Sequence, residues 1–211
     1  MAHSGNLFIV SGPSGAGKSV LSSSVLQLVP ELRFSVSYTT RPPRGMERNG
    51  VEYYFVDQAG FEELIQSGEL LEYALVYGNY YGTPRRFIQE CLARGEDVLV
   101  DIDVQGAQTV RQRCPDAVSI FIMPPSYQEL RERLECRKLD KDYVIEQRLR
   151  IAGQEIRHFK YYDYLIINRV LEESIEELKA IILGSRCRRS SRSEYAKSIV
   201  STFGGTDAED P

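Results

Sequence analysis

The sequence predicts an α/β protein built on a doubly wound parallel sheet, and three observations support that prediction. Short apolar runs, such as LFIV at residues 7–10 and DVLVDI at residues 97–102, are typical of buried parallel strands. Segments with the length and pattern of helices alternate with these runs along the chain. With 211 residues, of which 42% are hydrophobic, the chain can form one domain with inserted lobes.

The expected elements follow from the apolar pattern and from the breakers between them. Pro30 ends the first helix, and Gly68 and Gly95 are typical residues just after a helix. The expected strands lie at residues 7–10, 33–40, 51–56, 70–77, 97–102, 118–123 and 164–167. The expected helices lie at residues 18–28, 61–67, 84–94, 127–137, 143–159 and 171–183. Residues 34–86 are rich in strands and interrupt the alternation, so we expect an inserted lobe there.

The overall composition excludes several classes of partner. The chain has 26 Lys and Arg against 30 Asp and Glu, a net charge of −4, which does not suggest nucleic-acid or membrane binding. It has no apolar run of 18 residues and no leader-like N-terminus. Its four cysteines are scattered, as is typical of a reducing compartment. We therefore expect a cytoplasmic protein, and nothing in the sequence specifies an oligomeric state.

From Ser185 onward the composition changes to few apolar and many polar residues. Such a segment has little surface to bury, so we expect the tail at 185–211 to be at least partly flexible. Its basic run at residues 186–192 is most simply a solvated face.

The stretch SGPSGAGKS at residues 11–19 contains the pattern GxxxxGK[ST] between an expected strand and an expected helix. Its glycines let consecutive backbone N–H groups surround an anion, and the helix directs its positive end at the same point. In such a loop the lysine, Lys18, reaches the β- and γ-phosphates, and the hydroxyl of Ser19 can ligate Mg²⁺. The predicted ATP-binding residues are Gly12, Pro13, Ser14, Gly15, Ala16, Gly17, Lys18 and Ser19. GTPases, motors, transporter ATPases and small-molecule kinases all remain possible with this loop alone.

Three further stretches carry candidate binding residues. SVSYTTRPPRGMERNGVEYYF at residues 35–55 places Arg41 and Arg44 near tyrosines, which suits either a phosphate clamp or a solvated basic loop. GNYYGTPR at residues 78–85 is an aromatic turn that, alone, is more often structural. VLVDIDVQGA at residues 98–107 places Asp101 and Asp103 at the carboxyl end of a strand. Ligands bind at that edge of open α/β sheets, although carboxylates there can also cap helices.

In their order and spacing, these motifs resemble the guanylate kinase family over about residues 6–184. IFIMPPSYQELRERL at residues 120–134 and YDYLIIN at residues 162–168 also fit. The resemblance implies reversible transfer of the γ-phosphoryl group of ATP to GMP, and to dGMP, with Mg²⁺. It implies a P-loop core at 1–35, 87–125 and 151–184, a GMP-binding lobe at 36–86 and a helical lid at 126–150.

The resemblance also assigns roles to individual residues. The GMP phosphate ligands are Arg41, Arg44, Tyr53 and Tyr81, with Glu47 orienting the arginines. The base contacts are Ser37, Glu72, Thr83 and Asp103. Guanine presents N1–H and N2–H donors that suit carboxylates, whereas the N1 acceptor of adenine would remain unpaired.

The resemblance places Arg133, Arg137 and Arg148 on the lid, which closes over the transferred phosphoryl group. From the pattern alone, these arginines could equally form surface ion pairs with Glu129, Glu132 and Glu146. Arg133 and Asn168 are implied to bind ATP, Asn168 near the adenine, and Asp101 corresponds to a position that can reach Mg²⁺ through water. The implied catalytic residues are Lys18, Arg44, Arg137 and Arg148.

The chain departs from the family's usual pattern at three places. Val20 replaces a usual Thr, Gly45-Met46 replaces a usual Pro-Gly, and Cys136 and Lys138 flank Arg137 where a small residue is usual. Two alternatives stay open at this point: a non-catalytic guanylate-kinase-like interaction module, and a related P-loop kinase of a sugar phosphate.

Overall fold

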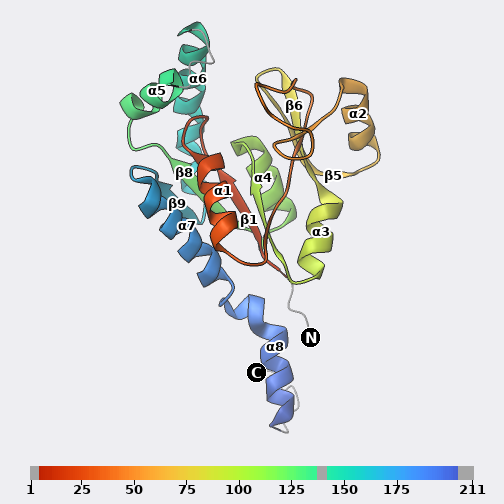
Figure 1. Ribbon diagram of the computed structural model, residues 1–211. Helices are drawn as coiled ribbons and strands as arrows, with labels where there is room; N and C mark the ends of the chain where they lie inside the picture. The colour runs from red at the N-terminus through yellow and green to blue at the C-terminus, as the bar shows by residue number, and fades with distance from the viewer. Residues whose placement is uncertain (1–4, 137–141, 204–211) are drawn as a thin grey trace.

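A parallel sheet forms the core of the computed structural model, which describes residues 5–136 and 142–203 (Figure 1). The sheet comprises β1 (Leu7–Ser11), β2 (Leu32–Phe34), β7 (Asp97–Asp101), β8 (Val118–Met123) and β9 (Tyr164–Ile167). The strands lie in the order β2-β7-β1-β8-β9, and all neighbouring pairs are parallel.

Both faces of this sheet are covered by helices, because successive side chains of each strand point to opposite faces. Phe8 and Val10 pack into a core with α1 (Lys18–Leu28) and α7 (Leu171–Ser185). Leu7 and Ile9 pack into a second core with α3 (Arg85–Ala93) and α4 (Val104–Arg113). This arrangement confirms the predicted doubly wound α/β fold.

The inserted lobe forms a second sheet of its own. Its strands are β3 (Tyr38–Thr39), β4 (Tyr54–Phe55), β5 (Leu70–Val76) and β6 (Asn79–Pro84), in the order β4-β3-β6-β5. Helix α2 (Gln58–Gln66) covers it through Phe61, whose ring stacks on that of Tyr80 at 5.3 Å. The lobe stands beside the core in Figure 1.

Two expected strands of the lobe are wrong in extent. The run at 33–40 is divided between β2 of the core sheet and β3 of the lobe sheet, because the chain leaves one sheet for the other at Ser35–Ser37. The run at 51–56 is a strand only over Tyr54–Phe55, where its backbone N–H groups find the carbonyls around β3. Alternation in the sequence does not reveal which sheet a strand joins.

The segment predicted as a lid, residues 126–150, contains α5 (Tyr127–Cys136) and most of α6 (Asp142–Glu155). Both helices share a small core of Leu130, Leu134, Ile145, Leu149 and Ala152. Arg137, the last residue of the expected helix at 127–137, lies outside the described residues. The expected helix at 143–159 ends earlier, at Glu155, and a 3₁₀ turn (Ile156–Tyr161) leads back to β9.

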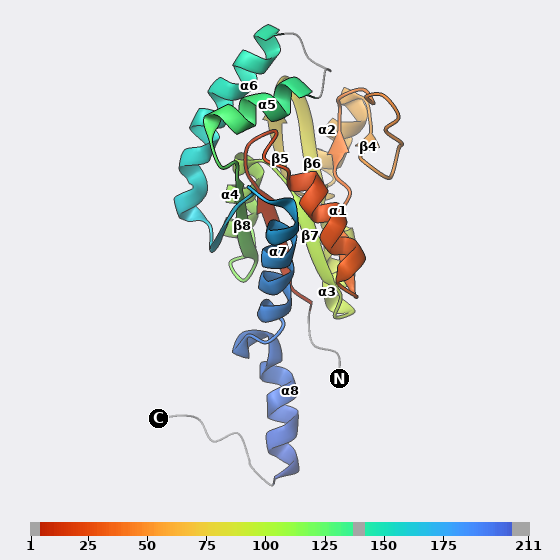
Figure 2. The ribbon, with the colours of Figure 1, turned by 60° about the vertical axis from the view of Figure 1, so that its left-hand side comes forward.

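Part of the tail forms a helix. Residues Arg189–Thr202 form α8, which projects from the body beyond the end of α7 (Figure 2). None of its residues is buried, so the expectation that the tail is at least partly flexible stays a prediction. Residues 204–211 lie outside the described part of the chain. Within the described ranges, no helix is both long and apolar enough to cross a membrane.

Candidate active site

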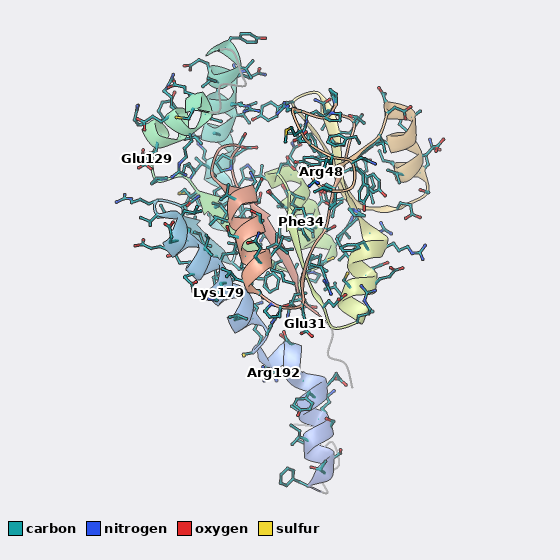
Figure 3. The ribbon with its side chains drawn as sticks, in the orientation of Figure 1. Glu31, Phe34, Arg48, Glu129, Lys179 and Arg192 are labelled. Carbon is teal, nitrogen blue, oxygen red and sulfur yellow. The ribbon has the colours of Figure 1, made fainter. Side chains whose placement is uncertain are left out.

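An open cleft of about 1060 Å³ lies between the P-loop, the inserted lobe and helix α6. Figure 3 labels Phe34, which lines this cleft where the chain passes from the core to the lobe, and Arg48 on the lobe itself. The cleft therefore opens at the carboxyl ends of β1 and β7, the edge at which an open α/β sheet binds ligands.

Between β1 and α1, the P-loop has the tight backbone that its glycines predict. Gly12, Gly15 and Gly17 have φ values of 141°, 90° and 98°, a region that L-residues with side chains rarely adopt. A Cβ on Gly12 would lie 2.2 Å from the carbonyl oxygen of Ile122, so only glycine fits at this point.

Lys18 and Ser19 begin α1 at the mouth of this loop. The Nζ of Lys18 donates hydrogen bonds to the carbonyl oxygens of Gly12 at 2.8 Å and Pro13 at 3.3 Å. The Oγ of Ser19 donates to Oδ2 of Asp101 at 3.2 Å. Burial raises the pKa of Asp101, and the positive charge of Lys18 and the Ser19 hydrogen bond counteract this rise. The P-loop, Lys18 and the oxygen pair of Ser19 and Asp101 thus lie together at the start of α1.

Two residues expected to bind ATP support the loop instead of lining the cleft. The Nδ2 of buried Asn168 donates to the carbonyl oxygen of Ala16 at 2.8 Å. Arg133 donates to the carbonyl oxygen of Asn168 at 2.8 Å and lies 3.5 Å from Glu129. The ion pair that was the alternative for Arg133 is therefore present, and neither residue is among those that line the cleft.

The candidate phosphate clamp in the lobe is organised by Glu47. Its two carboxylate oxygens accept from the guanidinium of Arg41 at 2.9 and 3.0 Å, and Oε2 also accepts from the backbone N–H of Arg44 at 2.7 Å. The Arg41 hydrogen bonds lower the pKa of Glu47, so it stays charged. Glu47 thus fixes the guanidinium of Arg41 and the backbone at Arg44 relative to each other.

Two tyrosines complete this side of the cleft. The rings of Tyr53 and Tyr81 meet edge to face at 5.7 Å, and the guanidinium of Arg41 lies 5.2 Å from the Tyr53 ring centre. Burial raises the pKa of Tyr53 to about 12, so its phenol remains a hydrogen-bond donor at neutral pH.

The candidate base pocket contains a buried carboxyl group. Glu72 is 3% exposed, and its Oε1 accepts from Thr83 Oγ1 at 2.5 Å. Burial raises its pKa to about 7, opposed by the Thr83 hydrogen bond and reinforced by the negative charge of Asp103. Ser37 is also buried and lines the cleft.

Asp103 caps a helix and also lies at the cleft. Its Oδ1 accepts from the backbone N–H of Gly106 at 2.9 Å, so it caps α4, and it also lines the cleft. A Cβ on Gly106 would lie 2.5 Å from Oε2 of Glu72, which shows how closely α4 approaches the base pocket.

Helix α6 forms the remaining wall, with Arg148 facing the cleft as expected. The cleft residues that sequence reasoning missed include Glu155, at the end of α6, and Tyr77, just after β5. Glu155 follows Arg148 by seven residues, two helical turns, which is the signal that could have revealed it.

The sequence departures have limited structural consequences. Val20 is exposed at the cleft, and Met46 is 93% exposed. Gly45 has a φ of 55°, and the backbone N–H of Glu47 still closes the turn on the carbonyl oxygen of Arg44 at 3.1 Å. The clamp geometry is therefore retained without the usual proline.

Comparison with known proteins gives one consistent result. The family model described as guanylate kinase matches residues 4–184. The chain belongs to the guanylate kinase family. The guanylate kinase of Koribacter versatilis (strain Ellin345) is 51% identical over 191 residues, covering 89% of this chain and 82% of the relative. That of Geobacter metallireducens is 46% identical over 188 residues, covering 89% and 93%.

A solved guanylate kinase has the same fold. The crystal structure of the enzyme from Anaplasma phagocytophilum superposes with a TM-score of 0.82 at 33% identity, covering 98% of this chain and 99% of that one. As a member of the guanylate kinase family, this protein is an enzyme, an ATP:GMP phosphotransferase. Neither the interaction module nor the sugar-phosphate kinase is favoured by these similarities.

Proposed function

We propose that the cleft binds ATP at the P-loop and GMP against the lobe, and that the phosphoryl group passes directly between them. The observation that carries this proposal is that one cleft contains both Lys18 and the Arg41–Glu47 clamp. Two phosphate sites on opposite walls suit in-line transfer, which needs positioning and charge stabilisation but no covalent enzyme intermediate. The reaction is reversible and yields ADP and GDP.

GMP selectivity rests on the pocket around Glu72. The carboxylates of Glu72 and Asp103 accept from the N–H donors of guanine, while Ser37 and Thr83 complete the polar surround. Adenine would place its N1 acceptor against a carboxylate lone pair, which leaves a buried polar group unpaired. Arg41, Arg44, Tyr53 and Tyr81 bind the phosphate of GMP and are indifferent to the base.

Charge that develops on the transferred group is balanced by Lys18, Arg44, Arg137 and Arg148. Arg44 is exposed on the lobe side of the cleft, and Arg148 lies on the lid side, so the group passes between opposed cations. Closure of the lid brings these groups together and excludes water, which strengthens their interactions. Arg133 and Asn168 contribute by holding the P-loop in shape.

The oxygen pair of Ser19 and Asp101 fits Mg²⁺, which prefers hydroxyl, carboxylate and water ligands. Ser19 would hold the ion directly and Asp101 through water. The ion would supply positive charge against the phosphates of ATP.

The same division of labour defines the units: a core at 1–35, 87–125 and 151–184, a GMP lobe at 36–86 and a lid at 126–150. A cytoplasmic location is supported by four free cysteines. No nucleic-acid partner is proposed, since the net charge is −4.

An ADP-release assay with ATP, Mg²⁺ and a panel of acceptors tests this proposal. GMP should be phosphorylated fastest and dGMP more slowly, with AMP and ribose phosphates at background. Turnover of a sugar phosphate in preference to GMP would overturn the acceptor assignment. No turnover of any acceptor, with GMP still bound, would instead favour the interaction module.

A further inference from the structure

Glu155 carries an orphaned acceptor in the cleft. It is the last residue of α6, and it lines the same cleft as the P-loop and the base pocket. Its Oε2 is fully buried and has no hydrogen-bond partner within the described structure. A buried acceptor without a partner is costly, so such an atom in a cleft marks a place where a ligand donor fits.

The electrostatic surroundings of Glu155 show which part of the cleft it faces. Burial raises its pKa to about 7, the positive charge of Lys18 lowers it, and the negative charge of Asp103 raises it further. Glu155 in turn raises the pKa of Tyr77, at the end of the β5–β6 hairpin on the opposite wall. Glu155 therefore lies within electrostatic reach of the phosphoryl-transfer end, the base pocket and the lobe.

The nucleotide group that lies between the base and phosphate sites is the sugar. A ribose carries two neighbouring hydroxyl donors, and a carboxylate with two oxygens is a common partner for them. Resting on the GMP orientation given above, we propose that Glu155 accepts hydrogen bonds from the ribose hydroxyls of GMP. It is then a specificity-determining residue that distinguishes ribonucleotides from deoxyribonucleotides.

Lys18 is close enough to allow a rival role, in which Glu155 orients the lysine or the metal. The two roles differ in one measurable respect. A ribose contact affects GMP but not an analogue that lacks the contacted hydroxyl, whereas an effect on phosphoryl transfer is the same for both.

The test is the kcat/KM of the full-length enzyme for GMP, 2′-deoxy-GMP and 3′-deoxy-GMP at saturating ATP. The wild type should favour GMP over at least one deoxy analogue by about 10- to 150-fold, the range for a hydrogen bond to a charged group. Glu155→Ala should lower kcat/KM for GMP to the level of that analogue and leave the analogue's own value nearly unchanged. Glu155→Gln, which keeps the shape and one acceptor, should be intermediate.

Glu146→Gln is the matched control, because Glu146 lies on the same helix, pairs with Arg131 at 2.6 Å and is not among the cleft residues. Its GMP-to-deoxy ratio should equal that of the wild type. Equal loss for all three nucleotides in Glu155→Ala would overturn the ribose contact in favour of the rival role. If the wild type phosphorylates GMP and both deoxy analogues with equal kcat/KM, only this inference is overturned. That outcome does not depend on how well the variants fold. Absence of GMP turnover would overturn the function itself.

Discussion

Arg41 and Glu47 form a two-point ion pair inside the lobe, in which both carboxylate oxygens contact the guanidinium at 2.9 and 3.0 Å. Arg41 is buried, and Glu47 also binds the backbone of Arg44. A planar guanidinium held at two points has a fixed orientation, which suits recognition of a phosphate. One carboxylate thus positions both arginines of the clamp.

Glu47→Gln should therefore weaken nucleotide binding without changing base choice. The amide retains an acceptor for one contact but loses the charge that holds Arg41, so we expect KM for GMP to rise about 10-fold. The kcat/KM values for GMP and AMP should fall by the same factor. Steady-state kinetics check this, with Glu62→Gln on exposed α2 as a control; a changed GMP-to-AMP ratio would assign Glu47 to the base pocket.

Glu72→Gln, in contrast, should change the ratio of kcat/KM for GMP to that for AMP. The amide has one acceptor fewer for guanine, so kcat/KM for GMP should fall. The amide can also donate to the N1 of adenine, so AMP should be rejected less strongly. One lost charge-assisted hydrogen bond is worth about 1.5–3 kcal/mol, or roughly 10- to 150-fold in kcat/KM. Arg44→Ala is the matched comparison, since it should weaken both nucleotides alike. If the two variants change the GMP-to-AMP ratio equally, the base and phosphate sites are not separate.

The pKa of about 7 on Glu72 predicts a pH dependence near neutrality. Only the carboxylate can accept from both guanine donors, so kcat/KM for GMP should rise as pH increases from 6 to 8. Thr83 lowers this pKa, so Thr83→Val should move the midpoint to higher pH. GMP itself ionises near pH 6, which makes Glu72→Gln the necessary control. If kcat/KM for GMP still rises near pH 7 in Glu72→Gln, the pH dependence belongs to another ionisable group.

The sequence was sufficient for the doubly wound core, because strands covered on both faces are recognisable as apolar runs such as residues 97–102. It was also sufficient for the P-loop, where Gly12 has no room for a side chain. It was insufficient where long-range contacts decide the structure. The run at 33–40 joins two sheets, and Arg133 reaches Asn168 across 35 residues. Glu155 was missed although it follows Arg148 by two helical turns, because that spacing shows a shared helix face but not burial of the carboxylate in a cleft.

The junction between α7 and α8 carries the last prediction. Asp97 is buried, and its Oδ2 accepts from Nε of Arg186 at 2.7 Å, while Oδ1 accepts from the backbone N–H of Asn6 at 2.7 Å. Arg186 also donates to the carbonyl oxygen of Pro30 at 2.6 Å. By contrast, α8 has no buried residue in its whole length. Arg186, between α7 and α8, is therefore more important for the stability of the fold than α8 itself.

Arg186→Ala should lower the free energy of unfolding by about 1.5–3 kcal/mol, because it removes a charged hydrogen bond from a buried carboxylate. For a chain of this size that is a fall in Tm of roughly 3–12 °C. Truncation after Arg188 should cost less, because it removes the hydrogen bonds of Ser191 to Asn6 and Ser185 and that of Arg192 to the carbonyl oxygen of Arg186. None of these bonds partners a buried charge. Both proteins should retain wild-type kcat/KM for GMP, because neither change touches the cleft. Thermal unfolding of Arg186→Ala and of the truncated chain tests this prediction, with the exposed Arg189→Ala as control. If the truncated chain is as unstable as Arg186→Ala, α8 docks on the body.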